Sequence, residues 1–508
     1  KTAVTLEIEM EKRLSFVHPF VWRLYQYVLE SHKVAVATSD MYISKEYMRD
    51  ILSQKGYTGL DDIYISCDYQ ESKYQGGLYE VIKKNFKGKK ILHIGDNRYS
   101  DIIKAKQHGI STVWIQNVNR VGERYRRFQH QSFIGSVYCG LVDAYIYNGT
   151  EENVIKCRHP YYLYGFLCGG PLTYGFCQWL DELTCKKKTD KIIFLARDGY
   201  IFSEIYKKYF QHTESEYAYA SRQALLPVLC NVDYDMYLQE AFYKRIVSMG
   251  MKPIEAFKDV GVYSYLDEKR QMEWEHHFSS EHVTWDVFKE WMLDHKAFFQ
   301  EAYQEQLQAI TEYFKQMIGD KKNIIIFDLG WRGTSILYLK KYLETQIEGL
   351  TITGAMMGAQ EMPMTELHVL HQDIEAYMFS EANPSMFSRI NGQKLMYIRE
   401  RLALEFMFTS PEASLLSYCI KGKECDFVFE KKNSNNNGDM IDRMHKGIRE
   451  YIQMYVDRGV TDGINSIGLN RAACLPVWQV LHDPKVLKLF QKYDERRSTL
   501  HGFLNKKV

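Results

Sequence analysis

Short apolar segments alternate with segments of helical spacing along the first quarter of the chain. Residues 33–38 and 90–94 are apolar runs, and each ends on polar or glycine residues. A strand that ends in this way and is followed by a helix is the repeating unit of a doubly wound α/β domain. We therefore predict a parallel sheet with helices on both faces up to about residue 115.

The same pattern returns in the second half of the chain. Residues 192–196 and 324–327 are strongly apolar, and a glycine-containing loop and a helix start follow each run. Shorter runs predict further strands at 217–220, 351–357 and 374–379. These segments together predict a second parallel sheet.

Two sheets require two hydrophobic cores, as expected for 508 residues. We predict an α/β protein with two doubly wound, Rossmann-like parallel-sheet domains, at residues 1–125 and 126–420. Helical spacing and many aromatic residues predict a helical insertion at about 231–320 in the second domain. A helical C-terminal segment is expected at 421–508, after a polar loop.

The composition of the chain argues against some kinds of partner and of cellular location. A net charge of +1 argues against nucleic acid, and ten cysteines without a Cys-x-x-Cys pair or metal-ligand spacing favour the cytoplasm. Residues 161–180 are long enough to cross a bilayer, but Gly169-Gly170-Pro171 interrupts them. We therefore predict two short buried helices there and no transmembrane segment.

The loop after the strand at 324–329 has the features of a phosphate site. Backbone N–H groups of a glycine loop and of the next helix start point at one small volume, where the helix dipole favours negative charge. Asp328, at the strand end, is suited to accept hydrogen bonds from sugar hydroxyls. A sugar phosphate is the implied ligand, and the loop residues are Gly330, Trp331, Arg332, Gly333, Thr334 and Ser335.

Two further strand ends carry guanidinium groups. Arg197, Asp198 and Gly199 follow the strand at 191–196, and Ser221 and Arg222 follow the one at 217–220. Planar guanidinium groups bind phosphate oxygens in pairs. Arg197 and Arg222 are therefore candidates for a pyrophosphate.

Together these three loops resemble the phosphoribosyltransferase fold of type I. The resemblance implies that the first loop and Arg222 hold the pyrophosphate of phosphoribosyl pyrophosphate, and that the loop from Asp328 to Ser335 binds the ribose 5-phosphate. That family has two adjacent acids followed by a Thr-Gly-x-Thr pattern, whereas here Phe327 occupies the first acidic position. Only Asp328 of the acid pair carries over.

The first quarter resembles the haloacid dehalogenase superfamily. Its order of strand-end residues is Ser39, then Lys73, then Asp96 with Asp101. The resemblance implies that Ser39 and Lys73 bind a transferring phosphoryl group and that Asp96 and Asp101 hold Mg²⁺, a hard cation that prefers carboxylate oxygens. Residues 1–32 would be the remnant of a helical cap.

That superfamily uses the first aspartate of an Asp-x-Asp pair as its nucleophile, and residues 1–32 contain no aspartate. The strand that carries the pair would lie in the middle of the sheet, and without it two neighbours would have unpaired backbone groups. We therefore expect a natural upstream segment with a hydrophobic strand that ends in Asp-x-Asp.

Two phosphate-handling domains indicate consecutive steps. The order of domains is similar to that of bacterial enzymes that install ribofuranose in surface polysaccharides. This resemblance implies transfer of 5-phosphoribosyl to a glycan or glycolipid acceptor, with Asp328, Asp198 and Arg197 as catalytic residues, followed by removal of the 5-phosphate. Such an enzyme would work in the cytoplasm, at the inner face of the membrane for a lipid-linked acceptor. Asp198 or an acid of the insertion would be the general base.

Two alternatives stay open at this point. One is a phosphatase whose second domain binds a sugar phosphate without turnover, and the other is a non-enzymatic sensor of phosphoribosyl pyrophosphate. The aromatic residue at Phe327, where the family has an acid, keeps the second alternative open.

Overall fold

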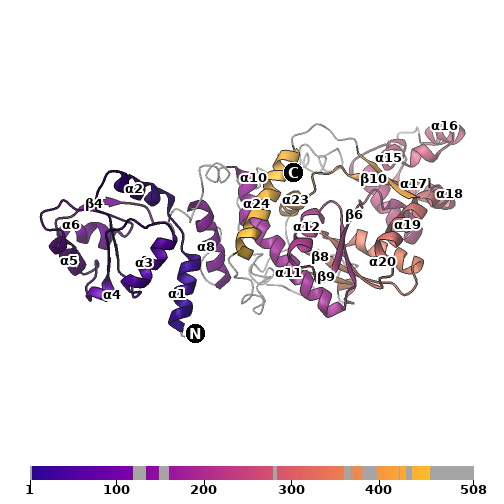
Figure 1. Ribbon diagram of the computed structural model, residues 1–508. Helices are drawn as coiled ribbons and strands as arrows, with labels where there is room; N and C mark the ends of the chain where they lie inside the picture. The colour runs from indigo at the N-terminus through magenta and orange to yellow at the C-terminus, as the bar shows by residue number, and fades with distance from the viewer. Residues whose placement is uncertain are drawn as a thin grey trace. The chain divides into compact units, whose positions relative to one another are not determined.

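The chain divides into two compact units, with the bulk of the first at Lys1–Leu163 and of the second at Tyr164–Ile452. The structure is a computed structural model (Figure 1), and it describes residues 3–117, 120, 133–147, 159–278, 283–359, 368–369, 371–378, 380, 398–422, 424–430 and 437–457. The boundary lies later than the expected one at residues 125/126, because helix α8 (Phe133–Tyr147) groups with the first unit.

The first unit alternates strands and helices, as the sequence predicts. Its elements are α1 (Ala3–Leu14), α2 (Pro19–Glu30), β1 (Val36–Ser39), α3 (Lys45–Gln54), β2 (Asp62–Ile65), α4 (Ser66–Tyr69), α5 (Gly77–Asn85), β3 (Leu92–Gly95), η1 (Arg98–Lys104), α6 (Ala105–Gln107) and β4 (Ser111–Trp114), followed by α8. A small core of Tyr64, Leu78, Tyr79, Ile82, Ala105 and Ile110 holds them together.

The strands of the first unit form two separate parallel pairs, β1 with β2 and β3 with β4. Among the described residues, no strand joins β1 to β3. The parallel pairing agrees with the expected α/β class, although the described strands of this unit do not form one continuous sheet.

The second unit contains a five-stranded parallel sheet in the order β6-β5-β7-β8-β9. The strands are β5 (Lys191–Leu195), β6 (Glu214–Ala218), β7 (Asn323–Asp328), β8 (Thr351–Met356) and β9 (Ile374–Ala376). Phe194 of β5 is level with Tyr217 of β6 and with Phe327 of β7. The carboxyl ends of these three strands therefore lie at one edge of the sheet, about 5 Å from strand to strand.

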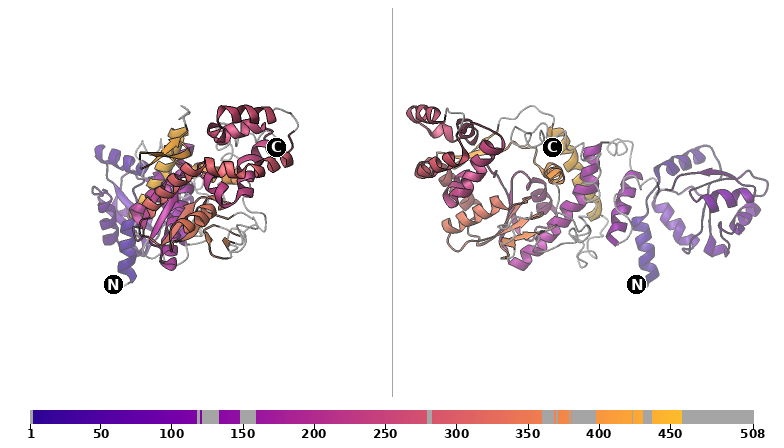
Figure 2. Two further views of the ribbon diagram at one scale, coloured as in Figure 1. Left: turned by 90° about the vertical axis from the view of Figure 1, so that its right-hand side faces the viewer. Right: turned by 180° about the vertical axis from the view of Figure 1, so that it is seen from behind.

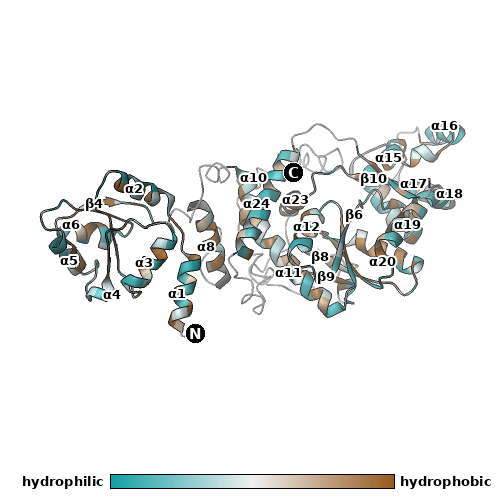
Figure 3. Ribbon diagram, in the orientation of Figure 1, coloured by the Kyte–Doolittle hydropathy of each residue, from teal (hydrophilic) through white to brown (hydrophobic). Residues whose placement is uncertain are grey.

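Helices cover the second sheet and extend beyond it. Helices α11 (Gly170–Lys187), α12 (Tyr200–Tyr209), α19 (Gln304–Ile318) and α20 (Thr334–Gln346) have a polar and an apolar side (Figure 3). The insertion is helical as predicted, with its own aromatic core around Phe242, Phe257 and Phe288. Figures 1 and 2 show α15 (Pro253–Val260), α16 (Glu268–His277), α17 (Trp285–Asp294) and α18 (Lys296–Ala302) grouped across the sheet from α11 and α24 (Asn437–Asp457).

The helical path at 160–187 differs from the two separate helices expected. α10 (Pro160–Tyr164), a π-helical turn η2 (Gly165–Gly169) and α11 follow one another directly, because the wider turn accommodates Pro171 near the start of α11. The glycines admit α24, since a Cβ atom on Gly170 would lie 2.5 Å from Tyr451 Cβ. Among the described residues, no helix is long and apolar enough to span a membrane.

The segment after residue 421 was expected to be helical, and it instead begins within a β-hairpin. Strand β10 (Leu415–Lys421) pairs with β11 (Glu424–Phe429), and Gly422 in the turn has a left-handed φ of 70°. Tyr418 and Phe427 pack on Tyr313 of α19, which gives the hairpin its buried face. Helix α24 follows as predicted, after helix α23 (Ile398–Phe408) earlier in the chain.

Candidate functional site

The five-stranded sheet has one topological switch point, between β5 and β7. The chain continues from β5 to β6 on one side, and from β7 to β8 on the other. Loops diverge at such a point, so the crevice between them is where doubly wound folds bind ligands. The predicted residues of the second domain follow β5, β6 and β7 at this edge of the sheet.

Asp328 ends β7, and the loop that follows curls back over it. The amides of Gly330 and Leu329 donate to its carboxylate. Burial raises the pKa of Asp328 above its usual value, while the positive charge of Arg222 and the amide of Gly330 oppose that rise. The amide of Gly330, which was expected to contact a phosphate, is thus directed at Asp328, and the groups left to bind a phosphate belong to the residues that follow.

Those next residues are the start of α20. Gly333 is the N-cap residue of α20, and as a glycine it has no side chain that could cap the helix. Within the described part of the chain, the hydroxyl groups of Thr334 and Ser335 make no hydrogen bond. The first N–H groups of α20 and these two hydroxyls are therefore available to an anion.

Both glycines of this loop are required by geometry. Gly330 and Gly333 have φ values of 70° and 68°, in the left-handed region. A Cβ atom would lie 2.4 Å from Met356 Cε at Gly330, and 2.8 Å from Ile374 Cδ1 at Gly333. The loop therefore packs directly on the ends of the neighbouring strands.

Trp331 and Phe327 point into the protein. The indole of Trp331 is 4% exposed and donates to Glu405 Oε1 of α23 at 3.1 Å. Phe327 is fully buried, with its ring 4.6 Å from that of Phe176 and 5.0 Å from that of Phe202. A carboxylate at position 327 would face this aromatic cluster without a polar partner, so an apolar residue suits this position.

The loop after β5 brings Arg197 and Asp198, both half-buried, to the same edge. The peptide bond between Ala196 and Arg197 is cis. A Cβ atom on Gly199 would lie 2.5 Å from the carbonyl oxygen of Leu195, so only glycine fits this close turn into α12. No ion pair or hydrogen bond of the Arg197 guanidinium is found with any residue that the structure describes.

After β6, Ser221 and Arg222 behave differently. Ser221 Oγ donates to the carbonyl of Leu415 at 2.6 Å and accepts from the amide of Ala224 at 3.0 Å, which anchors the loop to β10. Arg222 is exposed, and its charge acts on Asp328. Among the described residues its guanidinium has no carboxylate partner.

Three residues near these loops were missed by the sequence reasoning. Glu240, on η3 (Gln239–Ser248) of the insertion, accepts from Arg332 Nη1 at 3.2 Å. Lys244 follows on the same helix. His445 of α24 is buried and stacks on Tyr200 at the start of α12. Opposite charges four residues apart, such as Glu240 and Lys244, are common on solvent-exposed helices. Their spacing in the sequence therefore did not indicate a binding site.

In the first unit, Lys73 and Asp101 form a nearly buried ion pair. The Nζ–Oδ1 distance is 2.7 Å, and the side chains are 12% and 4% exposed. Asp101 also contacts His93 Nε2 at 3.2 Å and accepts from the amide of Asn97 at 3.0 Å. Burial would raise the pKa of Asp101, but the bonds from His93 and Lys73 hold it well below its usual range.

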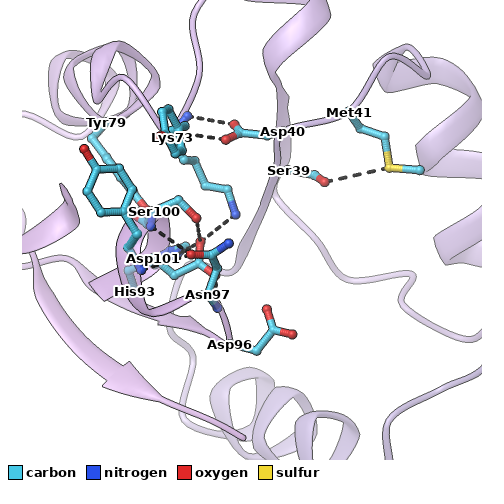
Figure 4. Close-up of polar contacts among 12 residues, drawn as sticks. Ser39, Asp40, Met41, Lys73, Tyr79, His93, Asp96, Asn97, Ser100 and Asp101 are labelled. Carbon is cyan, nitrogen blue, oxygen red and sulfur yellow. Dashed lines mark hydrogen bonds and ion pairs between the residues drawn. The ribbon is translucent and has the colours of Figure 1, made fainter. Parts of the chain in front are cut away.

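Figure 4 shows the Lys73 ammonium between the end of β1 and the Asp101 carboxylate. Asp40 fixes the lysine from the other side by accepting from the amides of Lys73 at 2.7 Å and Tyr74 at 3.1 Å. Ser39 Oγ has a weak contact with Met41 Sδ at 3.9 Å. The network thus joins the carboxyl end of β1 to that of β3, and it includes Asp40 and His93, which the sequence analysis had not singled out.

The two residues expected to hold Mg²⁺ have different surroundings. Asp96 is turned away from the Asp101 network (Figure 4), and its Oδ2 accepts from the side-chain Nδ2 of Asn117. Asp101 has its oxygens directed at Lys73, His93 and Asn97. Within the described residues no group of three or more histidine, cysteine or acidic side chains gathers. Asp96 has the carboxylate oxygens that a hard cation such as Mg²⁺ prefers, whereas the contacts of Asp101 position the side chain of Lys73.

Compared with models of known protein families and with curated proteins, the chain matches neither. The functional argument therefore depends on the two strand-end clusters: the loops after β5, β6 and β7 in the second unit, and the network around Lys73 in the first.

Proposed function

We propose that this protein is a glycosyltransferase that takes phosphoribosyl pyrophosphate as donor and transfers its 5-phosphoribosyl group to a glycan acceptor, with release of pyrophosphate. One observation carries the proposal: two loops with anion-binding groups flank the switch point of the five-stranded sheet. The loop after β5 offers Arg197, and the loop after β7 offers the uncapped start of α20. A sugar with phosphate groups at both ends matches two such loops.

The proposed roles follow from what each group is free to do. Gly333, Thr334 and Ser335 would hold the 5-phosphate, because the first N–H groups of α20 have no capping side chain. Arg197 and Arg222 would hold the pyrophosphate, and Asp328 the ribose hydroxyls. Gly199, Gly330, Trp331 and Ser221 would shape the loops without touching the donor.

In the proposed reaction, an acceptor hydroxyl attacks the anomeric carbon as the bond to pyrophosphate breaks on the opposite face. An α-configured donor then gives a β-ribofuranoside. Arg197 and Arg222 stabilise the negative charge that develops on the leaving pyrophosphate. Asp198 is the carboxylate of the same loop, and we assign it the acceptor's proton. Bound Mg²⁺ would add further neutralisation of the pyrophosphate.

For the first unit we propose removal of the 5-phosphate from the product, which makes the transfer irreversible. Lys73 would neutralise the equatorial oxygens of the phosphoryl group, with Asp101 and Asp40 holding its side chain and its backbone in place. Ser39 would donate its hydroxyl to the same group, and Asp96 would be a ligand of Mg²⁺. The nucleophile of this step would be a carboxylate. Both steps would occur in the cytoplasm.

Phosphorus-31 NMR of the intact protein with phosphoribosyl pyrophosphate and Mg²⁺ tests the proposal. We expect the pyrophosphate signal to grow only when a suitable acceptor is present, in a panel of bacterial glycans and glycolipids. The control is Arg443→Gln, an exposed arginine of α24, which should turn over like the wild type, whereas Arg197→Gln should lose most of the rate.

The alternatives predict different spectra. A phosphatase with a non-catalytic second domain would release inorganic phosphate and never pyrophosphate. A sensor would bind the donor and leave it intact with every acceptor. Absence of donor binding to the wild-type protein would remove the transferase proposal altogether.

A further inference from the structure

The helical insertion supplies charged groups to the edge of the sheet where the proposed donor site lies. Glu240 of η3 and Arg332 of the loop after β7 form an ion pair with an Nη1–Oε1 distance of 3.2 Å. This contact joins two segments 92 positions apart and fixes that helix against the loop. Arg245 holds the same helix to α15 within the insertion, because it is nearly buried and donates to Asp259 Oδ2 at 2.6 Å and to the carbonyl of Ala241 at 2.7 Å.

Lys244 lies on the side of η3 that faces the loop. It is four residues after Glu240, and residues four or five apart lie next to each other on a π-helix. Burial lowers the pKa of Lys244, and the positive charges of Arg222 and Arg332 lower it further, with Glu240 opposing. The groups that act on Lys244 thus come from the loop after β6, the loop after β7 and its own helix, including Arg245.

The cluster holds more positive than negative charge. Its cations are Arg222, Lys244 and Arg332, and Glu240 pairs with Arg332. No hydrogen bond or ion pair of the Lys244 ammonium is found with any residue that the structure describes. Bringing a half-buried ammonium beside two guanidinium groups is unfavourable unless an anion joins them.

We propose that Lys244 binds a phosphoryl oxygen of the donor between Arg222 and Arg332, so that the helical insertion forms one wall of the donor site. This inference rests on the proposed function, and it assigns to the insertion a part in donor binding. Two ends of the donor offer the same chemistry, the pyrophosphate and the 5-phosphate, and the experiment distinguishes them.

The test is calorimetric titration of phosphoribosyl pyrophosphate, inorganic pyrophosphate and ribose 5-phosphate, each with Mg²⁺, into the intact protein. We compare the wild type with Lys244→Met and Lys244→Arg. The matched control is Lys269→Met, an exposed lysine of the same insertion, on α16 at its far end (Figure 1). We expect Lys244→Met to weaken donor binding at least tenfold, and Lys244→Arg and Lys269→Met to bind within about threefold of the wild type.

Proton uptake gives a readout that a structural role would not affect. At the pH where the Lys244 ammonium loses its proton in the free protein, an anion should draw a proton back onto it, so the wild-type enthalpy should change with the ionisation enthalpy of the buffer. Neither Lys244→Met nor the permanently charged Lys244→Arg should show this change. Weakening with pyrophosphate alone would assign Lys244 to that end of the donor, and weakening with ribose 5-phosphate alone to the other.

Unchanged donor affinity in Lys244→Met, with normal binding by the wild type, would overturn this inference and leave the proposed function standing. A wild type that binds none of the three ligands would overturn both. Removing a repelled cation should not unfold the protein, so Lys244→Met should melt at the wild-type temperature or above it.

Discussion

His445 should make the stability of the second unit depend on pH in a way that a single substitution removes. Its side chain is 1% exposed and stacks on Tyr200 with ring centroids 5.9 Å apart. One ring nitrogen bonds to the backbone carbonyl of Met407, and Nε2 has no hydrogen-bond partner within the described structure. Burial, with the charge of Arg449, lowers the pKa of His445 from 6.5 to about 3.

The direction of the pH dependence follows from which state of the protein, folded or unfolded, binds a proton on His445 more readily. The unfolded chain takes up a proton on His445 below its ordinary pKa of 6.5, whereas the folded protein does not until about pH 3. Acid therefore favours the unfolded state, and the stability present above pH 6.5 is lost as the pH falls towards 3. Each pH unit in that window is worth about 1.4 kcal/mol, so pH 5 should cost about 2 kcal/mol relative to pH 7.

The assay is urea unfolding of the intact protein, followed by tryptophan fluorescence at about pH 7, 6 and 5. We compare the wild type with His445→Phe, which keeps a ring against Tyr200 and cannot titrate. The lost hydrogen bond to Met407 lowers its free energy of unfolding by about 1 kcal/mol at every pH. The difference between the two proteins should therefore change by about 2 kcal/mol in favour of the variant between pH 7 and 5.

His371→Phe is the control, because His371 is an exposed histidine of the same unit. It should keep the pH dependence of the wild type. Parallel curves for the wild type and His445→Phe would refute the reasoning, since they would mean that the His445 ring is charged or solvated in the folded protein.

Two further predictions concern the strand-end clusters. Asp101→Asn should destabilise the first unit by about 3 kcal/mol, because it leaves the Lys73 ammonium nearly buried without its carboxylate, and thermal melting should show the loss. Asp50→Asn removes a carboxylate from an exposed pair and should cost under about 1 kcal/mol; equal effects would contradict a buried pair. Gly330→Ala should cost about 1 kcal/mol more than Gly349→Ala in urea unfolding, because both glycines have a left-handed φ but only Gly330 has the buried Met356 side chain against it, which a Cβ atom would displace. Similar losses at the two glycines would show that the contact with Met356 is not tight.

The strand-loop-helix units of the second domain could be predicted because each is local in sequence. Continuous apolar runs at 192–195 and 324–327 mark buried parallel strands, and parallel strands bring their carboxyl ends to one edge. This is why the candidate residues at Asp328, Arg197 and Arg222 could be assigned to the same edge of one sheet before the structure was known.

The contacts that distinguish binding residues from structural ones could not be predicted, because they join distant positions. Ser221 bonds to Leu415, and Glu204 of α12 forms a two-bond ion pair with Arg449 of α24. In the sequence, a serine beside an arginine indicates a phosphate site. The sequence does not show that the hydroxyl of this serine donates to a carbonyl group 194 positions away. The contribution of Lys244 depends in the same way on how the insertion packs.

The hairpin β10–β11 was missed for a different reason. In the sequence, the charged residues at 421–424 come seven positions before the polar run at 431–439, so the two together resemble one long linker. Only the packing of Tyr418 and Phe427 on Tyr313 reveals that the flanking residues are strands.

The central claim, that the donor binds where β5, β6 and β7 end, is tested most directly by calorimetric titration of phosphoribosyl pyrophosphate with Mg²⁺ into three proteins. They are the wild type, Asp328→Asn and Asp190→Asn. Asp190 is the matched control, because its carboxylate accepts from the amides of Lys322 at 3.0 Å and Asn323 at 2.8 Å at the opposite end of β7.

We predict micromolar binding by the wild type and by Asp190→Asn, and affinity at least about tenfold lower in Asp328→Asn, the loss expected for hydrogen bonds to a charged group. Equal affinity in all three proteins would place the donor elsewhere, and no binding by the wild type would contradict the account as a whole.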